Sequence, residues 1–83
     1  MKHAGSQALD SLEPLLDRLR GYPDLKEKAR GVFYRRGRAF LHFHEDPAGL
    51  FADVRLTDDF ERFALQGDAD RAALLDRVLQ TLG

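Results

Sequence analysis

Two histidines and one aspartate have the types and spacing that suit metal or acid–base chemistry. His42 and His44 are separated by one residue, and Asp53 follows in the next extended segment. In a strand this spacing turns both imidazoles to one face, with their β-carbons about 7 Å apart. If the two segments form a hairpin, Asp53 lies opposite His42. Two imidazoles and a carboxylate are the ligand set of open iron or zinc sites, so His42, His44 and Asp53 form a candidate metal site.

Instead of binding a metal, the same residues could have a purely structural role. His42 could pair with Asp53 through a cross-strand hydrogen bond, and His44 could stack on Phe51. An acid–base pair of His42 and Asp53 would also need a nucleophile nearby. The hydroxyl side chains other than the tyrosines fall in termini, loops or helix ends: Ser6, Ser11, Thr57 and Thr81. The sequence therefore favours a non-enzymatic protein without a cofactor.

Four strands are predicted from short runs rich in aromatic and β-branched residues, bounded by turn residues. Their ranges are 31–36, 38–45, 50–56 and 60–66. Arg36-Gly37 is a candidate two-residue hairpin turn, because glycine readily adopts a positive φ. The segment 46–49 (Asp-Pro-Ala-Gly) has proline and glycine where a four-residue turn uses them.

A first helix is predicted within residues 8–20. Leucines at three- and four-residue steps define its apolar face: Leu9, Leu12, Leu16 and Leu19. Because proline is tolerated only in a first helical turn, Pro14 indicates either a cap at Ser11 or a kink at Glu13, and we favour the Ser11 cap. Gly21 ends this helix.

A last helix is predicted over residues 68–82. Asp68 is a favourable N-cap, and Asp70 would lie in the positive first turn. The expected apolar stripe consists of Ala72, Leu75, Val78, Leu79 and Leu82. Residues 1–7 show no such periodicity and are predicted as a loose terminus.

These elements predict one α+β domain over residues 1–83, in the order α-β-β-β-β-α. We expect a four-stranded antiparallel sheet with the N- and C-terminal helices packed on one face. The turns set the register, and the expected pairs on the covered face are Glu45–Leu50, Phe43–Ala52, Leu41–Val54, Ala39–Leu56, Tyr34–Ala39 and Val32–Leu41. A slip of one residue would bury His42, Asp53 and Arg55, so the register is strongly specified.

The opposite face of the predicted sheet gathers rings and charges. Three phenylalanines facing solvent are unusual for a monomer, and an aromatic centre with a charged rim is typical of protein contacts. We therefore predict a protein-binding or self-association module, with a homo-oligomer or a protein as partner. Its interface residues are Phe33, Phe40, His42, His44, Phe51 and Arg55. Alternatively, residues 1–10 or 21–30 fold over this face.

A further alternative is nucleic-acid binding at the first hairpin. Residues 18–38 hold eight basic residues against two acidic ones, whereas the whole chain has a net charge of −1. Residues 36–43 resemble the signature of RNA-recognition motifs, in which bases stack on aromatic rings. The residues that would take part are Arg35, Arg36, Arg38 and Phe40. The β-α-β-β-α-β order of that fold is absent, and Arg38 stands where a stacking aromatic belongs, so this function ranks below an interface.

The composition of the chain excludes several kinds of site and several classes of protein. The chain has no cysteine, which excludes disulfides, thiolate metal sites and cysteine nucleophiles. Its first residues lack the apolar run of a signal peptide, and no stretch approaches the roughly 20 apolar residues of a membrane span. We expect a cytoplasmic protein without membrane contact.

Residues 36–44 (Arg-Gly-Arg-Ala-Phe-Leu-His-Phe-His), followed by Ala52-Asp53-Val54, resemble small bacterial domains catalogued as luciferase-like. With the closing strand and the last helix, the likeness spans residues 22–82. Those domains share a glycine-basic start, a His-x-His-like strand, an Asp-containing partner strand and a C-terminal helix, and they have a longer segment between the third and fourth strands. A weaker resemblance is to the MmcQ/YjbR-like family, which has a similar helix–sheet–helix plan and is sometimes labelled DNA-binding. The luciferase name implies no light-producing chemistry, and the sequence shows no luciferin or flavin site.

Overall fold

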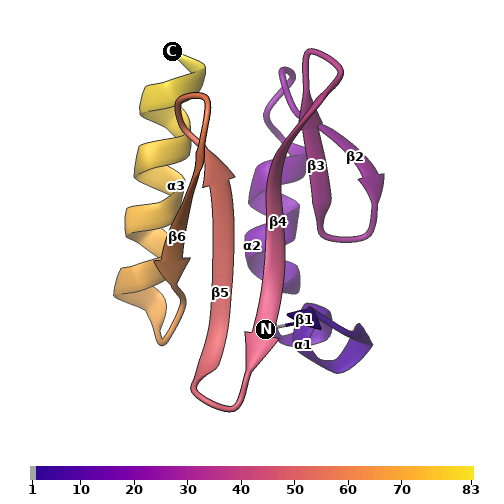
Figure 1. Cartoon of the computed structure of the whole chain (residues 1–83), viewed down its shortest axis with the longest axis vertical. Helices are drawn as coiled ribbons and strands as arrows, with labels where there is room; N and C mark the ends of the chain where they lie inside the picture. The colour runs from indigo at the N-terminus through magenta and orange to yellow at the C-terminus, as the bar shows by residue number, and fades with distance from the viewer. Residues whose placement is uncertain (1) are drawn as a thin grey trace.

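The computed structural model describes residues 2–83, which form an α+β fold with an open antiparallel sheet (Figure 1). The elements are β1 (Lys2–His3), α1 (Ser6–Ser11), α2 (Glu13–Arg20), β2 (Lys26–Ala29), β3 (Val32–Arg35), β4 (Arg38–Asp46), β5 (Gly49–Arg55), β6 (Phe60–Ala64) and α3 (Asp68–Leu82). The strand order is β2-β3-β4-β5-β6, and β1 pairs with β4. The α+β class is confirmed, but the count of four strands is wrong because β1 and β2 also join the sheet.

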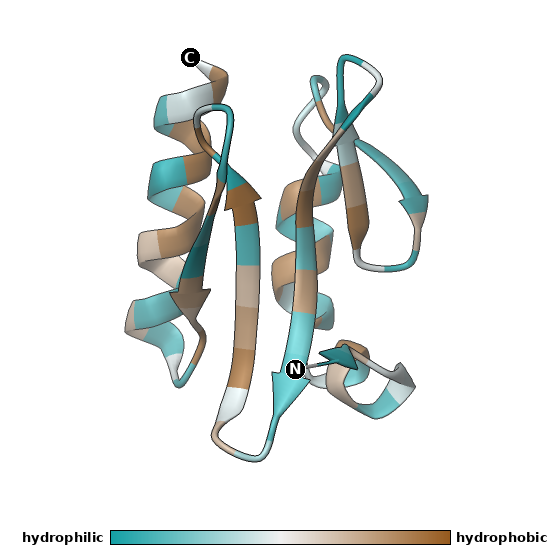
Figure 2. Ribbon diagram, viewed as in Figure 1, coloured by the Kyte–Doolittle hydropathy of each residue, from teal (hydrophilic) through white to brown (hydrophobic). Residues whose placement is uncertain are grey.

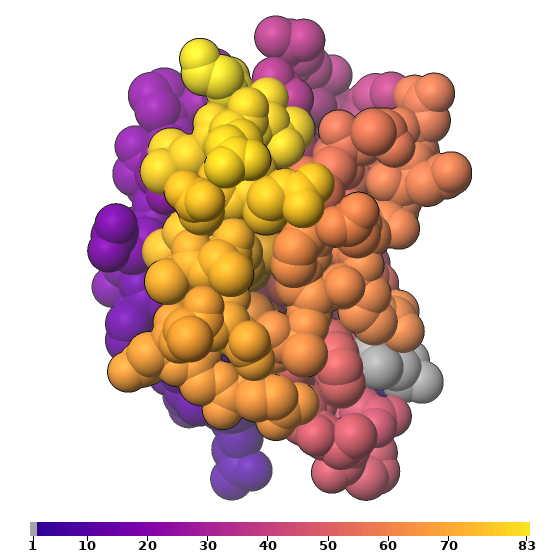
Figure 3. Space-filling view, turned by 90° about the vertical axis from the view of Figure 1, so that its left-hand side faces the viewer, coloured from indigo at the N-terminus to yellow at the C-terminus, as the bar shows by residue number. Residues whose placement is uncertain are grey.

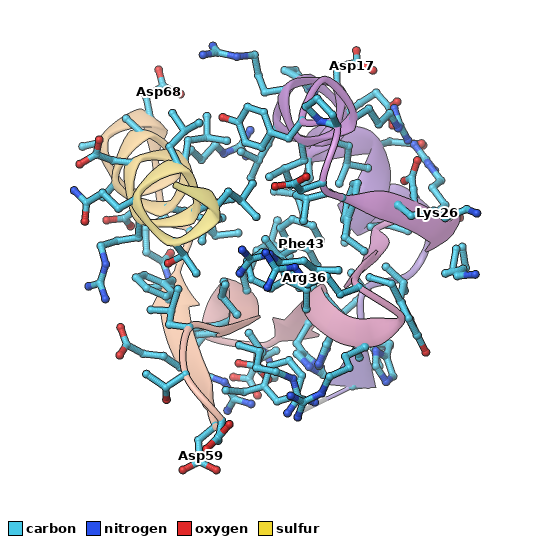
Figure 4. The ribbon with its side chains drawn as sticks, turned by 90° about the horizontal axis from the view of Figure 1, so that it is seen from above. Asp17, Lys26, Arg36, Phe43, Asp59 and Asp68 are labelled. Carbon is cyan, nitrogen blue, oxygen red and sulfur yellow. The ribbon has the colours of Figure 1, made fainter. Side chains whose placement is uncertain are left out.

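Helices α2 and α3 cover one face of the sheet. Figure 4 shows both helices in one layer and the strands in the other, and Figure 3 shows the atoms of the C-terminal segment (yellow) next to those of the N-terminal segment (indigo to purple). The fully buried leucines Leu12, Leu16 and Leu19 pack in one core with the inward residues of β4 and β5. Figure 2 shows that hydrophobic and hydrophilic residues alternate in the middle of β4, which then ends in a hydrophilic stretch beside the N-terminus. The second face of β4 is therefore free to carry polar side chains.

The β4–β5 hairpin has the predicted register. Leu41 lies opposite Val54, Phe43 opposite Ala52, and Asp46 opposite Gly49. Gly49 adopts a φ of 136°, and the backbone N–H of Ala48 donates to the Asp46 carboxylate at 3.0 Å. All four apolar residues of the two central pairs are buried. As predicted, this register places His42 opposite Asp53 on the other face.

The β3–β4 hairpin departs from the predicted register. Arg36 and Gly37 form its turn with φ of 53° and 79°, and Tyr34 pairs with Ala39 as expected. A bulge then leaves Phe40 unpaired, so that Phe33 instead of Val32 lies opposite Leu41. A β-bulge inserts one extra residue and changes the side to which the following residues point.

Because of this bulge, the aromatic face of the sheet differs from the predicted one. Phe33 and Phe40 are only 1% and 2% exposed and belong to the hydrophobic core. The prediction that both rings face solvent is wrong. The core gains two large rings, whose burial is worth about 1.5–3 kcal/mol each.

The N-terminal segment is more ordered than predicted. Residues 2–3 pair with β4, and the Ala4 backbone N–H donates to the Phe43 carbonyl at 3.0 Å. The expected single helix is divided at Leu12 into α1 and α2, and Ser11 donates its hydroxyl to the Ala8 carbonyl instead of capping α2. Pro14 lies in the first turn of α2, where its missing N–H costs nothing. The end of the helix at Gly21 is confirmed.

Helix α3 has the predicted bounds, but its buried face differs. Gly67 is the N-cap instead of Asp68, and the Asp70 carboxylate accepts a hydrogen bond from the Gln66 backbone N–H. The fully buried residues are Leu74 and Val78, whereas Leu79 is 51% exposed. No helix within residues 2–83 is long and apolar enough to cross a membrane.

The turn between β2 and β3 gives a test of the fold. Gly31 has a φ of 78°, and a β-carbon there would lie 2.6 Å from the Leu9 side chain in the core. Gly31→Ala is expected to lower the free energy of unfolding by roughly 2–4 kcal/mol, because a left-handed backbone and overpacking both cost energy. Gly37→Ala is the control, because Gly37 also has a positive φ but has nothing within 4 Å. It should cost about 1–2 kcal/mol. Equal losses in urea denaturation would contradict the packing of α1 on this turn.

Candidate metal centre

The three histidines of the chain converge on the outer face of the sheet. His42 and His44 come from β4, and His3 comes from β1, which pairs with β4 at His44. One ligand nitrogen from each residue lies within 4.8 Å of the others. The ring centroids of His3 and His44 are 4.8 Å apart and nearly stacked, and those of His42 and His44 are 4.8 Å apart and edge-on. Three imidazoles from two strands therefore form one cluster.

Within residues 2–83, several buried ring nitrogens of this cluster have no hydrogen-bond partner. They are Nδ1 of His42 and both Nδ1 and Nε2 of His44. The His44 Nε2 lies 3.1 Å from the Asp53 carboxylate, which is an ion-pair distance, but no hydrogen bond joins the two groups. Leaving a buried polar atom unpaired costs about 1–3 kcal/mol. A bound cation would satisfy such nitrogens.

Asp53 is the carboxylate beside the cluster. It is 8% exposed and receives two hydrogen bonds from Arg62 of β6, at 2.8 and 3.0 Å. This bidentate pair holds the carboxylate in a fixed orientation. Asp53 of β5 thus contacts His44 of β4, and Arg62 of β6 holds the Asp53 carboxylate in place. A carboxylate that orients a metal-binding histidine is a common arrangement.

The charges of the cluster follow from these contacts. The hydrogen bonds from Arg62 lower the pKa of Asp53, which keeps this carboxylate ionised. Burial, followed by the proximity of His44, lowers the pKa of His42. Of the other charged neighbours, Asp53 raises the pKa of His42, whereas His3 and Arg62 lower it. A neutral imidazole is the form that binds metals, so this environment favours a ligand state at His42.

The structure changes two of the predicted contacts of these residues. His42 lies opposite Asp53 in the register, but the short contact of that carboxylate is with His44. His44 lies opposite Phe51, as the predicted register requires, but its ring stacks on His3. The metal candidates His42, His44 and Asp53 are therefore brought together. Their role as ligands stays a hypothesis.

The predicted interface residues are divided by the structure. His42, His44, Phe51 and Arg55 lie on the outer face, but Phe33 and Phe40 do not. The remaining face has one prominent ring, Phe60, which is 39% exposed and packs edge-on against His42 at 5.0 Å. Protein binding or self-association stays a prediction, with fewer aromatic residues to support it.

The residues predicted to bind nucleic acid are also separated by the structure. Arg35, Arg36 and Arg38 lie at the β3–β4 hairpin, but Phe40 is buried and presents no ring for a base to stack on. Stacking on exposed rings is a main source of single-strand affinity. This observation weakens the nucleic-acid alternative.

Sequence reasoning missed two residues of the cluster, His3 and Arg62. His3 lies in a segment without periodicity, and Arg62 is separated from its partner Asp53 by a loop. One signal was available: the chain has only three histidines, and two of them already shared a strand face. The third was then the natural candidate for a further ligand.

No protein-family model matches the chain, and comparison with curated proteins and with solved structures gives no match either. The resemblance to luciferase-like and MmcQ/YjbR-like domains therefore stays a hypothesis. Functional inference has to come from the site itself.

The environment of His42 predicts a pH dependence in the metal-free protein. Its pKa is lowered in the folded state, so the unfolded chain takes up a proton first as the pH falls below about 6.5. The free energy of unfolding should therefore decrease between pH 7.5 and 5.5. His42→Gln should flatten this slope, because glutamine does not titrate. Identical slopes in urea denaturation of the two proteins would contradict the assigned burial of His42.

Proposed function

We propose that this protein is a metal-binding domain that holds a divalent transition-metal ion, with zinc as the first candidate, through His3, His42 and His44. The observation that carries the proposal is the convergence of all three histidines around ring nitrogens that have no partner. Imidazole is a preferred ligand of zinc, copper and nickel. The absence of cysteine leaves histidine and carboxylate as the strong ligands that this chain can offer.

The geometry supports a tetrahedral site after small side-chain rotations. An ion with bonds of about 2.0–2.1 Å to nitrogen holds its ligand nitrogens about 3.3 Å apart. The three nitrogens are already within 4.8 Å of one another. Contraction around an ion also relieves the unpaired nitrogens of His42 and His44. Three protein ligands leave a fourth position for water or another small ligand.

Asp53 fits a supporting role in this site. Its carboxylate contacts His44 and is neutralised by Arg62, so it can accept the second N–H of a metal-bound imidazole. Such partners fix the orientation of the ligand and raise its basicity. Asp53 is not among the three residues whose ligand atoms lie within 4.8 Å of one another, so its proposed role is to orient His44.

The ion would also join the N-terminal strand to the sheet. β1 has only two residues, and its other side-chain tie is an ion pair between Lys2 and Glu45 at 3.6 Å, with Lys2 largely exposed. Exposed pairs of this kind are worth at most about 1 kcal/mol. A shared metal ion would therefore be the strongest link between His3 and β4.

Zinc is expected to stabilise the protein against heat. At a free zinc concentration of 100 times the Kd, linkage adds about 2.7 kcal/mol, which corresponds to roughly 10–20 °C for a domain of this size. His3→Gln, His42→Gln and His44→Gln should each lower zinc affinity by more than about 100-fold, because each removes one of the three proposed ligands. Asp53→Asn should lower it by about 10–100-fold as a supporting residue.

Lys2→Gln is the matched control, because it alters β1 next to His3 but removes no imidazole. Its zinc affinity, measured by calorimetric titration, should equal that of the unmodified protein. A loss at His42 and His44 with no loss at His3 would contradict the three-histidine site. Zinc that leaves the melting temperature unchanged up to millimolar concentration would contradict the proposal altogether.

A further inference from the structure

A second polar site lies at the end of the sheet formed by the β3–β4 turn and the β5–β6 connection. A cavity of about 160 Å³ opens there. Four arginines line it together with an apolar floor and one hydroxyl: Arg35, Arg36, Arg38, Arg55, Ala39, Phe40, Leu56 and Thr57. Figure 4 looks down on this end of the molecule and places Arg36 over its centre.

The guanidinium groups of this cavity have no carboxylate partners. None of the four arginines forms an ion pair within residues 2–83. The Nε of Arg35 is buried and has no hydrogen-bond acceptor in this part of the chain. An anion in the cavity would give this buried, charged donor an acceptor.

Other arginines of the same basic segment are neutralised. Arg20 contacts Glu13, Asp17 and Glu27, and Arg30 contacts Asp10 and Glu13. Arg20 and Arg30 are therefore neutralised by nearby carboxylates, whereas the arginines at the β3–β4 turn are not. Four arginines without a carboxylate partner among residues 2–83 thus surround one cavity.

Part of this site is held in place before any ligand binds. Arg55 donates to the Ala39 carbonyl at 2.8 Å and to the Asp58 carbonyl at 3.0 Å, and its guanidinium packs over the Phe60 ring at 4.4 Å. Arg35 lies over the ring of buried Phe40 at 5.9 Å. Fixed donors lose little entropy when an anion binds.

The chemistry and the size of the cavity together limit the ligand. The planar fork of an arginine matches two oxygens of a phosphate group, and several arginines can share a doubly charged one. At about 30 Å³ for each water molecule, the cavity has room for a phosphate group. Phe40 is buried, so no exposed ring of this site is available for a nucleobase.

We propose that this cavity binds a dianionic phosphate group, either as inorganic phosphate or as the terminal phosphate of a small phosphomonoester. Arg36 and Arg38 supply the exposed charge, Arg35 and Arg55 supply the positioned donors, and Thr57 adds a hydroxyl. The site is independent of the histidine cluster and does not require a metal.

Titration of the metal-free full chain, followed by backbone amide NMR in the presence of a chelator, tests this proposal. The probes are inorganic phosphate, phenyl phosphate, and a single-stranded oligonucleotide without a terminal phosphate, at constant ionic strength with chloride. Saturable shifts are expected for phosphate at residues 35–39 and 55–57. Tighter binding of phenyl phosphate assigns the site to a phosphomonoester, and equal binding assigns it to the free ion.

The variants separate binding from folding. Arg36→Asn removes one guanidinium at a position with a φ of 53°, which asparagine tolerates well, so the fold should keep its stability. It should lower phosphate affinity by about tenfold or more, as should Arg38→Gln, because each removes a charge-assisted hydrogen bond. Arg18→Gln is the matched control, since it removes an exposed arginine from α2 on the other face.

Three results would overturn the proposal. The first is equal loss of affinity in Arg18→Gln and Arg36→Asn, which indicates general charge attraction. The second is a response to phosphate that does not saturate or that chloride reproduces. The third is tighter binding of the oligonucleotide at the same residues, which assigns the arginines to a nucleic-acid backbone.

Discussion

The pairing of β4 along both of its edges is the constraint on which the rest of the structure depends. β5 occupies one edge, while β3 and then β1 occupy the other. Leu41 and Phe43 are buried, and their burial against the helices leaves His42 and His44 on the opposite face. Because side chains alternate along a strand, the core that stabilises β4 also fixes the direction of both imidazoles. The position of the candidate metal centre is therefore a consequence of hydrophobic packing.

The outer face of the sheet buries polar groups at a cost in stability, and a purely structural role does not explain this cost. His44 and Asp53 are nearly buried, and ring nitrogens of His42 and His44 have no partner. Arg62 pairs with Asp53, whose carboxylate also lies 3.1 Å from His44 Nε2, but within residues 2–83 the buried nitrogens of His42 and His44 form no hydrogen bond. The arginine cavity also contains polar groups without a partner of opposite charge among residues 2–83. Because these groups are cationic donors, they would bind an anion. Phe60 lies between the two sites, with His42 at one side and Arg55 at the other. Unsatisfied polar groups of both kinds are typical of binding sites.

Much of this arrangement could be predicted from local sequence, because turn residues and alternation determine a hairpin. The segment 46–49 and the apolar residues on either side of it sufficed for the β4–β5 register, and hence for the pairing of His42 with Asp53. The bounds of the helix over residues 68–82 could be predicted, although its N-cap is Gly67 instead of Asp68. The buried position of Leu74 depends on how α3 lies on the sheet.

The errors arose where tertiary packing decides the outcome. The bulge at Phe40 has no sequence signal such as a glycine, and it turned two aromatic rings from the predicted surface into the core. Strands β1 and β2 are two and four residues long, too short for a periodic pattern. For that reason His3, the third imidazole of the cluster, could not be placed from sequence.

We propose that three imidazoles of this protein bind one metal ion. X-ray absorption spectroscopy of the zinc-loaded full chain can test this, because multiple scattering from imidazole rings counts the histidine ligands. We expect three imidazoles with Zn–N distances of about 2.0–2.1 Å and one further light-atom ligand. A zinc ion with two imidazoles or fewer, or one surrounded only by oxygen, would contradict it.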